Sequence, residues 1–101
     1  MRREEVLEIL RSHAAELQSE GVTSASLFGS MARGEVAPKD VDLAVRLSER
    51  FSDGGLDYFW RKEQLRAKLG ALLGCPVDIV AEPARKGSLQ QEIDRDRVLV
   101  F

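Results

Sequence analysis

The sequence predicts an α/β (α+β) domain in which a mixed four-stranded sheet has helices packed on it. Segments with apolar residues at helical spacing alternate along the chain with short segments rich in β-branched residues. The 101 residues leave room for one hydrophobic core, so we expect a single domain over residues 1–101. The composition, with 44% hydrophobic and 32% charged residues, is typical of a soluble globular protein.

The first half of the chain predicts a helix, a strand and a tight turn, in that order. Apolar residues recur at helical spacing over residues 3–20, and Gly21 ends this helix. Residues 22–28 are rich in β-branched and small side chains and predict a strand. The Gly-Ser pair that follows makes a turn, and a short helix begins at Met31.

The second half predicts three more strands and two more helices. Large apolar residues, Val41, Leu43 and Val45, alternate with Asp42 and Ala44, which indicates a strand with one buried face. A loop over residues 48–56 leads into a long amphipathic helix from about Asp57 to Gly74. The remaining predicted elements are a strand over residues 77–80, a short helix from a capping box of Ser88 and Gln91 to about Arg95, and a strand over residues 98–101.

The charge and the lengths of the apolar segments limit the class of protein. A net charge of -2 and a pI of about 5.4 argue against a general nucleic-acid binder, because such domains neutralise phosphates with clustered basic residues. The N-terminal residues show no signal peptide, and no segment approaches the ~20 apolar residues of a membrane span. We therefore expect a cytoplasmic protein that binds neither membranes nor nucleic acid directly.

Asp40 and Asp42 stand two residues apart at the start of the second predicted strand. Their side chains leave the same face of that strand, roughly 6.6 Å apart along the chain. Two carboxylates that share a cavity repel each other without a cation, which favours a bound divalent metal such as Mg²⁺. A solvated strand edge is the ordinary alternative, although the apolar neighbours of Asp42 favour a partner for its charge.

Gly29 and Ser30, which end the first predicted strand, form a candidate phosphate site. Glycine lets the backbone approach a ligand closely, and a serine hydroxyl with the free N–H groups of a helix start can hold phosphate oxygens. Arg33 lies one helical turn from Ser30 and can face the same way. A plain turn, with Ser30 as the helix cap and Arg33 in solvent, is an open alternative.

Asp78 is the third candidate carboxylate. It stands between Val77 and Ile79 on the third predicted strand, where a surface position is the simple explanation. If the second and third strands are neighbours, Asp78 can join Asp40 and Asp42 at one metal, as a ligand or as the general base for an attacking hydroxyl. Its role therefore depends on that adjacency.

An aromatic cluster of Tyr58, Phe59 and Trp60 opens the long predicted helix. A platform for stacking nucleotide bases is one interpretation of such a cluster. The position on an amphipathic helix favours core packing or a partner-facing patch instead.

The spacing of these motifs resembles the signature of the nucleotidyltransferase superfamily to which DNA polymerase β belongs. In that signature a Gly-Ser pair is followed, after a spacer, by Asp-x-Asp, and here nine residues separate Ser30 from Asp40. The segments Leu-Phe-Gly-Ser-x-Ala-Arg-Gly and Asp-Leu-Ala-Val are similar to those of the minimal nucleotidyltransferases, in which Pro-Val-Asp-Ile-Val matches the third-carboxylate strand. The resemblance runs from about Val6 to the C-terminus and implies the nucleotidyltransferase fold.

The resemblance implies a role for each matching residue. Asp40 and Asp42 would hold two Mg²⁺ ions, Asp78 would complete the site of one of them, and these three residues would be catalytic. The Gly-Ser pair would hold the triphosphate of ATP, with Arg33 as a supporting phosphate or structural contact. One residue departs from the pattern, because Lys39 stands where many minimal members have Ser. Lys39 could contact phosphate or pair with Asp40.

The activity that the resemblance implies is Mg²⁺-dependent transfer of AMP from ATP to a hydroxyl group. Minimal nucleotidyltransferases resemble the antitoxin partners of small helical HEPN ribonuclease toxins. The expected acceptor is therefore a tyrosine of a HEPN toxin, supplied in trans in a hetero-oligomer. Two alternatives stay open: a non-catalytic antitoxin that neutralises the toxin by binding, and, with less support, a small-molecule nucleotidyltransferase.

Overall fold

The computed structural model describes residues 1–35 and 40–101, so Lys39 and its predicted contacts lie outside the described residues. Four strands in these residues form one sheet in the order β3-β2-β1-β4. β1 is antiparallel to both β2 and β4, whereas β2 and β3 are parallel. The strands are β1 (Val22–Phe28), β2 (Val41–Leu47), β3 (Val77–Ala81) and β4 (Val98–Leu99). The predicted mixed four-stranded sheet is thus confirmed.

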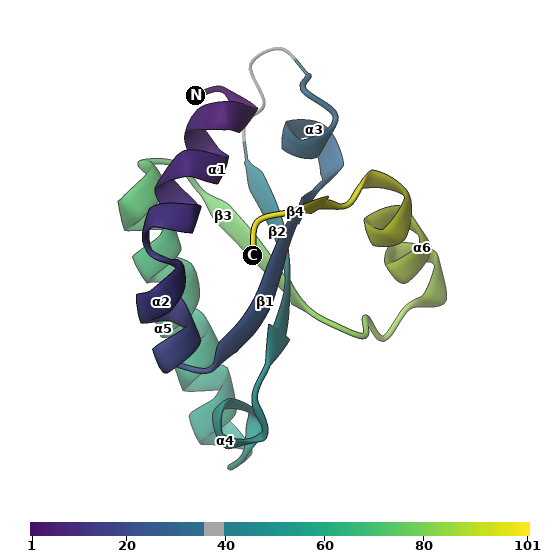
Figure 1. The fold of residues 1–101 in the computed structure, drawn as a ribbon. Helices are drawn as coiled ribbons and strands as arrows, with labels where there is room; N and C mark the ends of the chain where they lie inside the picture. The colour runs from purple at the N-terminus through teal and green to yellow at the C-terminus, as the bar shows by residue number, and fades with distance from the viewer. Residues whose placement is uncertain (36–39) are drawn as a thin grey trace.

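Helices cover both faces of this sheet (Figure 1). One face carries α1 (Arg3–Ser12), α2 (Ala14–Ser19) and α5 (Leu56–Leu73), and the other carries α6 (Gly87–Asp96). In the described part of the chain, no helix combines the length and the apolar character needed to cross a bilayer.

Side chains of the strands alternate between two hydrophobic clusters. Leu27 and Leu43 belong to the main cluster, beneath α1, α2 and α5. The next residue in each strand, Phe28 or Ala44, belongs to a smaller cluster with Ile93 of α6. The alternation of apolar residues along each strand therefore determines on which face of the sheet its polar side chains lie.

Two segments near α2 and α5 differ from the sequence prediction. The expected single helix over residues 3–20 is interrupted at His13, whose φ of -104° and ψ of 9° separate α1 from α2. The expected loop over residues 48–56 contains a short helix, α4 (Glu49–Ser52). It forms because the Ser48 hydroxyl accepts a hydrogen bond from the Phe51 N–H and the Phe51 ring is buried.

Other boundaries also differ. The short helix α3 (Gly29–Ala32) begins at the glycine and not at Met31. The predicted capping box of Ser88 and Gln91 is wrong, because α6 begins at Gly87 with Lys86 in the capping position, and no side-chain hydrogen bond caps it. β4 ends at Leu99, two residues before the end of the predicted strand. The backbone of the last two residues bonds to that of Ala25, and their carbonyls also accept hydrogen bonds from the Arg11 guanidinium and the Ser24 hydroxyl.

Candidate functional site

One end of the sheet gathers the polar residues of the three central motifs. β1 ends where β2 and β3 begin, because β1 runs antiparallel to β2 and β2 parallel to β3. The register places Asp42 opposite Phe28 on one side and opposite Asp78 on the other. The turn at Gly29 and Ser30 follows Phe28 directly, so it lies at the same end. The strand adjacency on which the role of Asp78 depends is confirmed.

Asp42 and Asp78 leave the face of the sheet that carries α6. Leu43 and Val77, their neighbours along the chain, are buried in the main cluster on the opposite face, and side chains alternate along a strand. Asp42 is half-buried, whereas Asp40 and Asp78 are exposed. The carboxylates therefore stand at the end of the sheet where β2 and β3 begin.

The electrostatic environment of Asp42 is unfavourable for a negative charge. Burial raises the pKa of Asp42 above its ordinary value, and the carboxylates of Asp78, Asp40 and Glu92 raise it further. The guanidinium of Arg33 acts in the opposite direction. A partly buried carboxylate among like charges is an environment in which a bound cation is stabilising.

Gly29 allows the turn to approach Asp42. Its φ of +73° lies in the left-handed region, and a Cβ built at this position would stand 2.4 Å from Oδ2 of Asp42. No side chain fits in that space without displacing the carboxylate. Ser30 is not the helix cap of the alternative interpretation, because α3 begins at Gly29 and its capping residue is Phe28.

Arg33 connects α3 to α6. Its Nε donates a hydrogen bond to Glu35 at 2.6 Å, and a terminal nitrogen donates to Asp96 at 2.7 Å. The Asp96 side chain is 5% exposed, and both partners raise the pKa of Arg33. Arg33 is therefore a structural contact of the turn in this conformation and would have to exchange partners to reach a phosphate.

The predicted metal ligands lie at the same end of the sheet, but their side chains are not arranged as a complete metal-binding site. Among residues 1–35 and 40–101, no three His, Cys, Asp or Glu side chains are grouped closely enough to hold an ion. Asp40, Asp42 and Asp78 offer the carboxylate oxygens that Mg²⁺ prefers, and all three contribute to the repulsion described above. The donor chemistry fits the ion, and the metal site stays a prediction.

Two residues near the carboxylates were missed by the sequence analysis. Glu92 of α6 is one of the charges that raise the pKa of Asp42. Arg66 of α5 lines a hollow of about 310 Å³ together with Asp78, and its pKa is raised first by Glu63 and also by Asp78. Neither residue stands in a recognisable motif, because only the packing of α5 and α6 brings them to this end of the sheet.

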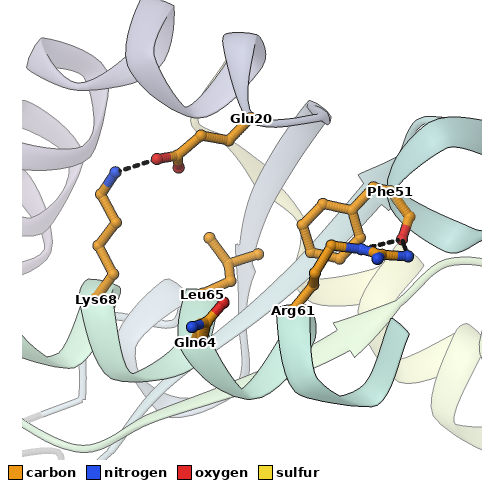
Figure 2. A pocket seen from close by; sticks show the side chains of 6 residues that line it. All are labelled: Glu20, Phe51, Arg61, Gln64, Leu65 and Lys68. Carbon is orange, nitrogen blue, oxygen red and sulfur yellow. Dashed lines mark hydrogen bonds and ion pairs between the residues drawn. The ribbon is translucent and has the colours of Figure 1, made fainter. Parts of the chain in front are cut away.

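A second hollow lies between α2, α4 and α5, away from the carboxylates (Figure 2). It measures about 280 Å³, and its charged groups are paired within the protein. Lys68 bonds to Glu20 at 2.6 Å and to Glu16 at 2.8 Å, and Arg61 donates to the Phe51 carbonyl at 2.8 Å. With both cations paired, this hollow is part of the helix packing, and the carboxylate end is the candidate site.

Comparison with known proteins identifies the family. Residues 7–101 match the family described as Polymerase beta, Nucleotidyltransferase. The chain belongs to this nucleotidyltransferase family. The predicted nucleotidyltransferase fold is thereby confirmed, and the carboxylate end of the sheet corresponds to the motif on which the family resemblance rested.

Individual relatives of this nucleotidyltransferase cover nearly its whole length. The protein adenylyltransferase MntA of Thermococcus cleftensis is 33% identical over 99 residues, which are 96% of this chain and 94% of MntA. A solved structure of a candidate minimal nucleotidyltransferase is 32% identical, with a TM-score of 0.72 over 97% of this chain and 95% of that one. An MNT antitoxin in complex with the tri-AMPylated HEPN toxin of Shewanella oneidensis has 18% identity and a TM-score of 0.65, over 94% and 71% of the two chains. This last likeness concerns the fold alone.

Proposed function

We propose that this nucleotidyltransferase transfers AMP from ATP to a tyrosine hydroxyl of a partner HEPN toxin and so acts as its antitoxin. The related MntA is a protein adenylyltransferase, and the fold is shared with an MNT antitoxin that is bound to an AMPylated HEPN toxin. In this chain, the observation that carries the proposal is the register of Asp42 beside Asp78, with the Gly29 backbone against Asp42.

The residues of this end of the sheet would position ATP and neutralise its charge. Transfer of a phosphate-linked group depends mainly on positioning and electrostatic stabilisation, with little covalent help from the protein. Gly29 and Ser30 would hold the phosphates. Asp40, Asp42 and Asp78 would hold Mg²⁺, which neutralises charge on the phosphate oxygens when it is bound. Arg33 supports the turn through its bond to α6.

The acceptor oxygen forms a bond to the α-phosphorus of ATP, while the bond from that phosphorus to the bridging oxygen of the β-phosphate breaks. Pyrophosphate leaves, and AMP stays on the acceptor. The proton of the acceptor hydroxyl passes to a carboxylate. We assign this role to Asp78, because it is exposed at the hollow and lies beside the half-buried Asp42.

Labelled ATP tests the proposal directly. Incubation with Mg²⁺, ATP labelled at the α-phosphate and a HEPN toxin should place label on the toxin, on a tyrosine identified by mass spectrometry. Asp40→Asn with Asp42→Asn should reduce this labelling at least a hundredfold. Labelling by the wild type that does not exceed that of the double variant would contradict an enzymatic function.

A binding-only antitoxin is the second candidate function. It is favoured by one observation, namely that no three carboxylates are grouped into a metal centre within the described residues. Cell survival separates the two candidates. If a variant with Asn at positions 40, 42 and 78 protects cells from the toxin as well as the wild type does, neutralisation proceeds by binding.

A further inference from the structure

β3 leaves one edge of the sheet open. It is the first strand in the order β3-β2-β1-β4, and the described residues contain no strand beyond it. The Pro76 carbonyl accepts a hydrogen bond from β2, and the Glu82 N–H donates one to β2. Since alternate residues of a parallel strand bond to the same neighbour, the backbone groups of Ile79 and Ala81 point away from β2.

A groove of about 550 Å³ follows this open edge between α5 and the segment that leads into α6. Ile79 and Ala81 line it from β3, and Phe59, which is 60% exposed, lines it from α5. Phe59, Ile79 and Lys62 also line the hollow that contains Asp78. The groove therefore runs from the open strand edge to the carboxylate that we assign as the base.

The groove carries positive charge. Lys62, Arg85 and Lys86 line it, and none of the ion pairs within the described residues involves them. The acidic residue of its wall, Glu82, is neutralised by Arg97, which bonds to both carboxylate oxygens at 2.8 and 2.5 Å. The Glu82 side chain is also only 1% exposed. An occupant of the groove meets basic side chains, an exposed aromatic ring and free backbone groups.

We propose that the groove binds an extended acidic segment of the acceptor protein, which adds a strand to β3 and brings its hydroxyl to Asp78. This inference rests on the proposed function. The main chain of the segment bonds to Ile79 and Ala81, and its acidic side chains face Lys62 and Lys86. A single-stranded nucleic acid fits less well, because it offers no main-chain N–H and C=O partners for the open edge of β3.

Trp60 provides a probe of binding that needs no ATP. It is the single tryptophan, is 64% exposed and stands next to Phe59 in the chain. The ligand is a synthetic peptide of about twelve residues that alternates Glu with Val and carries one Tyr. We expect saturable changes in Trp60 fluorescence, with affinity at least about tenfold weaker in Lys62→Glu with Lys86→Glu. Arg50→Glu, a charge reversal of an exposed residue of α4, is the matched control and should bind as the wild type does.

Amide hydrogen exchange tests the added strand in the same samples. The amides of Ile79 and Ala81 should exchange more slowly with peptide, whereas those of Asp78 and Val80, which face β2, should not change. Three results overturn the inference: no binding of the acidic peptide, equal binding of a peptide with Lys in place of Glu or of a single-stranded oligonucleotide, or equal affinity in the double variant.

Transfer assays separate this inference from the proposed function. If the wild type and the Lys62→Glu with Lys86→Glu variant label a HEPN toxin at the same rate, the groove is not the acceptor site, and AMP transfer stands. If the peptide binds as expected and no toxin is labelled, the inference of a peptide-binding groove is supported and the proposed AMP transfer is contradicted.

Discussion

Gly29 lets the backbone turn close to the Asp42 carboxylate, which the side chain of any other residue at this position would displace. Replacement by Ala combines an unfavourable left-handed backbone with a Cβ 2.4 Å from Oδ2 of Asp42. We expect Gly29→Ala to lower the free energy of unfolding by about 1–3 kcal/mol more than Gly74→Ala does. Gly74 is the matched control, since its φ is +70° and a Cβ there would have no neighbour within 4 Å. Urea unfolding measures the difference, and equal losses would contradict the close approach.

We expect Asp42 to oppose folding of the metal-free protein and to be required for the proposed AMP transfer. Its pKa is raised in the folded state, so the folded protein binds this proton more tightly than the unfolded chain does. Above the folded pKa, the ionised form therefore destabilises the fold, and this effect disappears as the pH falls below the unfolded value.

Asp42→Asn should consequently raise the melting temperature in EDTA at pH 7 by a few degrees, and the gain should shrink on acidification. The same variant should lose AMP transfer. Thermal melts over a range of pH check the first expectation. A lower melting temperature than that of the wild type at pH 7 would show that Asp42 stabilises the metal-free fold.

The motif residues were predictable and their surroundings were not. Asp40, Asp42 and Asp78 stand out locally, because a charge within an apolar strand is conspicuous in the sequence. Arg66 and Glu92 look like ordinary solvated residues of amphipathic helices. Their proximity to the carboxylates depends on how α5 and α6 pack, which local patterns do not encode.

At the scale of elements, a partly buried ion pair joins Arg97, at the end of α6, to Glu82, in the segment after β3. Glu82 accepts two hydrogen bonds from Arg97, and Arg97 also donates to the Ser26 hydroxyl of β1 at 3.1 Å. The hydrogen bonds from Arg97 hold the pKa of Glu82 below its ordinary value, and the hydrogen bond from Gln90 adds a smaller effect in the same direction. The pair therefore stabilises the fold above the ordinary pKa of a glutamate and loses this effect as the pH falls through the lowered value.

Glu82→Gln should lower the free energy of unfolding at pH 7 by about 1–3 kcal/mol, because Arg97 loses a charged partner in a buried setting. The difference from the wild type should narrow in acid. Glu49→Gln, at an exposed position of α4, is the control and should change stability little. Urea unfolding at several pH values measures both, and a pH-independent difference would exclude the linkage to Glu82.

The strands were easier to predict than the short helices and the pairing. β1 matches its predicted range over residues 22–28, because its composition is distinctive and Gly29 ends it. α4 was hidden by its Ser-Asp-Gly-Gly surroundings and depends on the burial of Phe51. The parallel pairing of β2 with β3 joins residues that are far apart in the chain. The sequence therefore did not predict that Asp78 lies beside Asp42, and the role of Asp78 depended on that pairing.

At the scale of the whole molecule, our proposals assign ATP to the carboxylate end of the sheet and the acceptor protein to the β3 groove. If ATP with Mg²⁺ binds at the carboxylate end as we propose, it relieves the repulsion around Asp42, and we expect it to stabilise the whole fold. At a concentration 100-fold above the dissociation constant, the expected gain is about 2.7 kcal/mol. The gain should vanish when EDTA replaces Mg²⁺, and it should be lost in Asp40→Asn with Asp42→Asn.

The groove variant Lys62→Glu with Lys86→Glu is the control for this measurement of stabilisation by ATP and Mg²⁺. Neither changed residue belongs to the Gly29 turn; Lys86 lines the groove, and Lys62 lines both the groove and the hollow of Asp78. We therefore expect this variant to keep most of the stabilisation by ATP and Mg²⁺. Thermal melts of the three proteins, with and without ligand, provide the comparison. If the groove variant lost the ligand-induced shift while the Asp variant kept it, ATP would bind in the β3 groove, and the assignment of the two substrates would have to be exchanged.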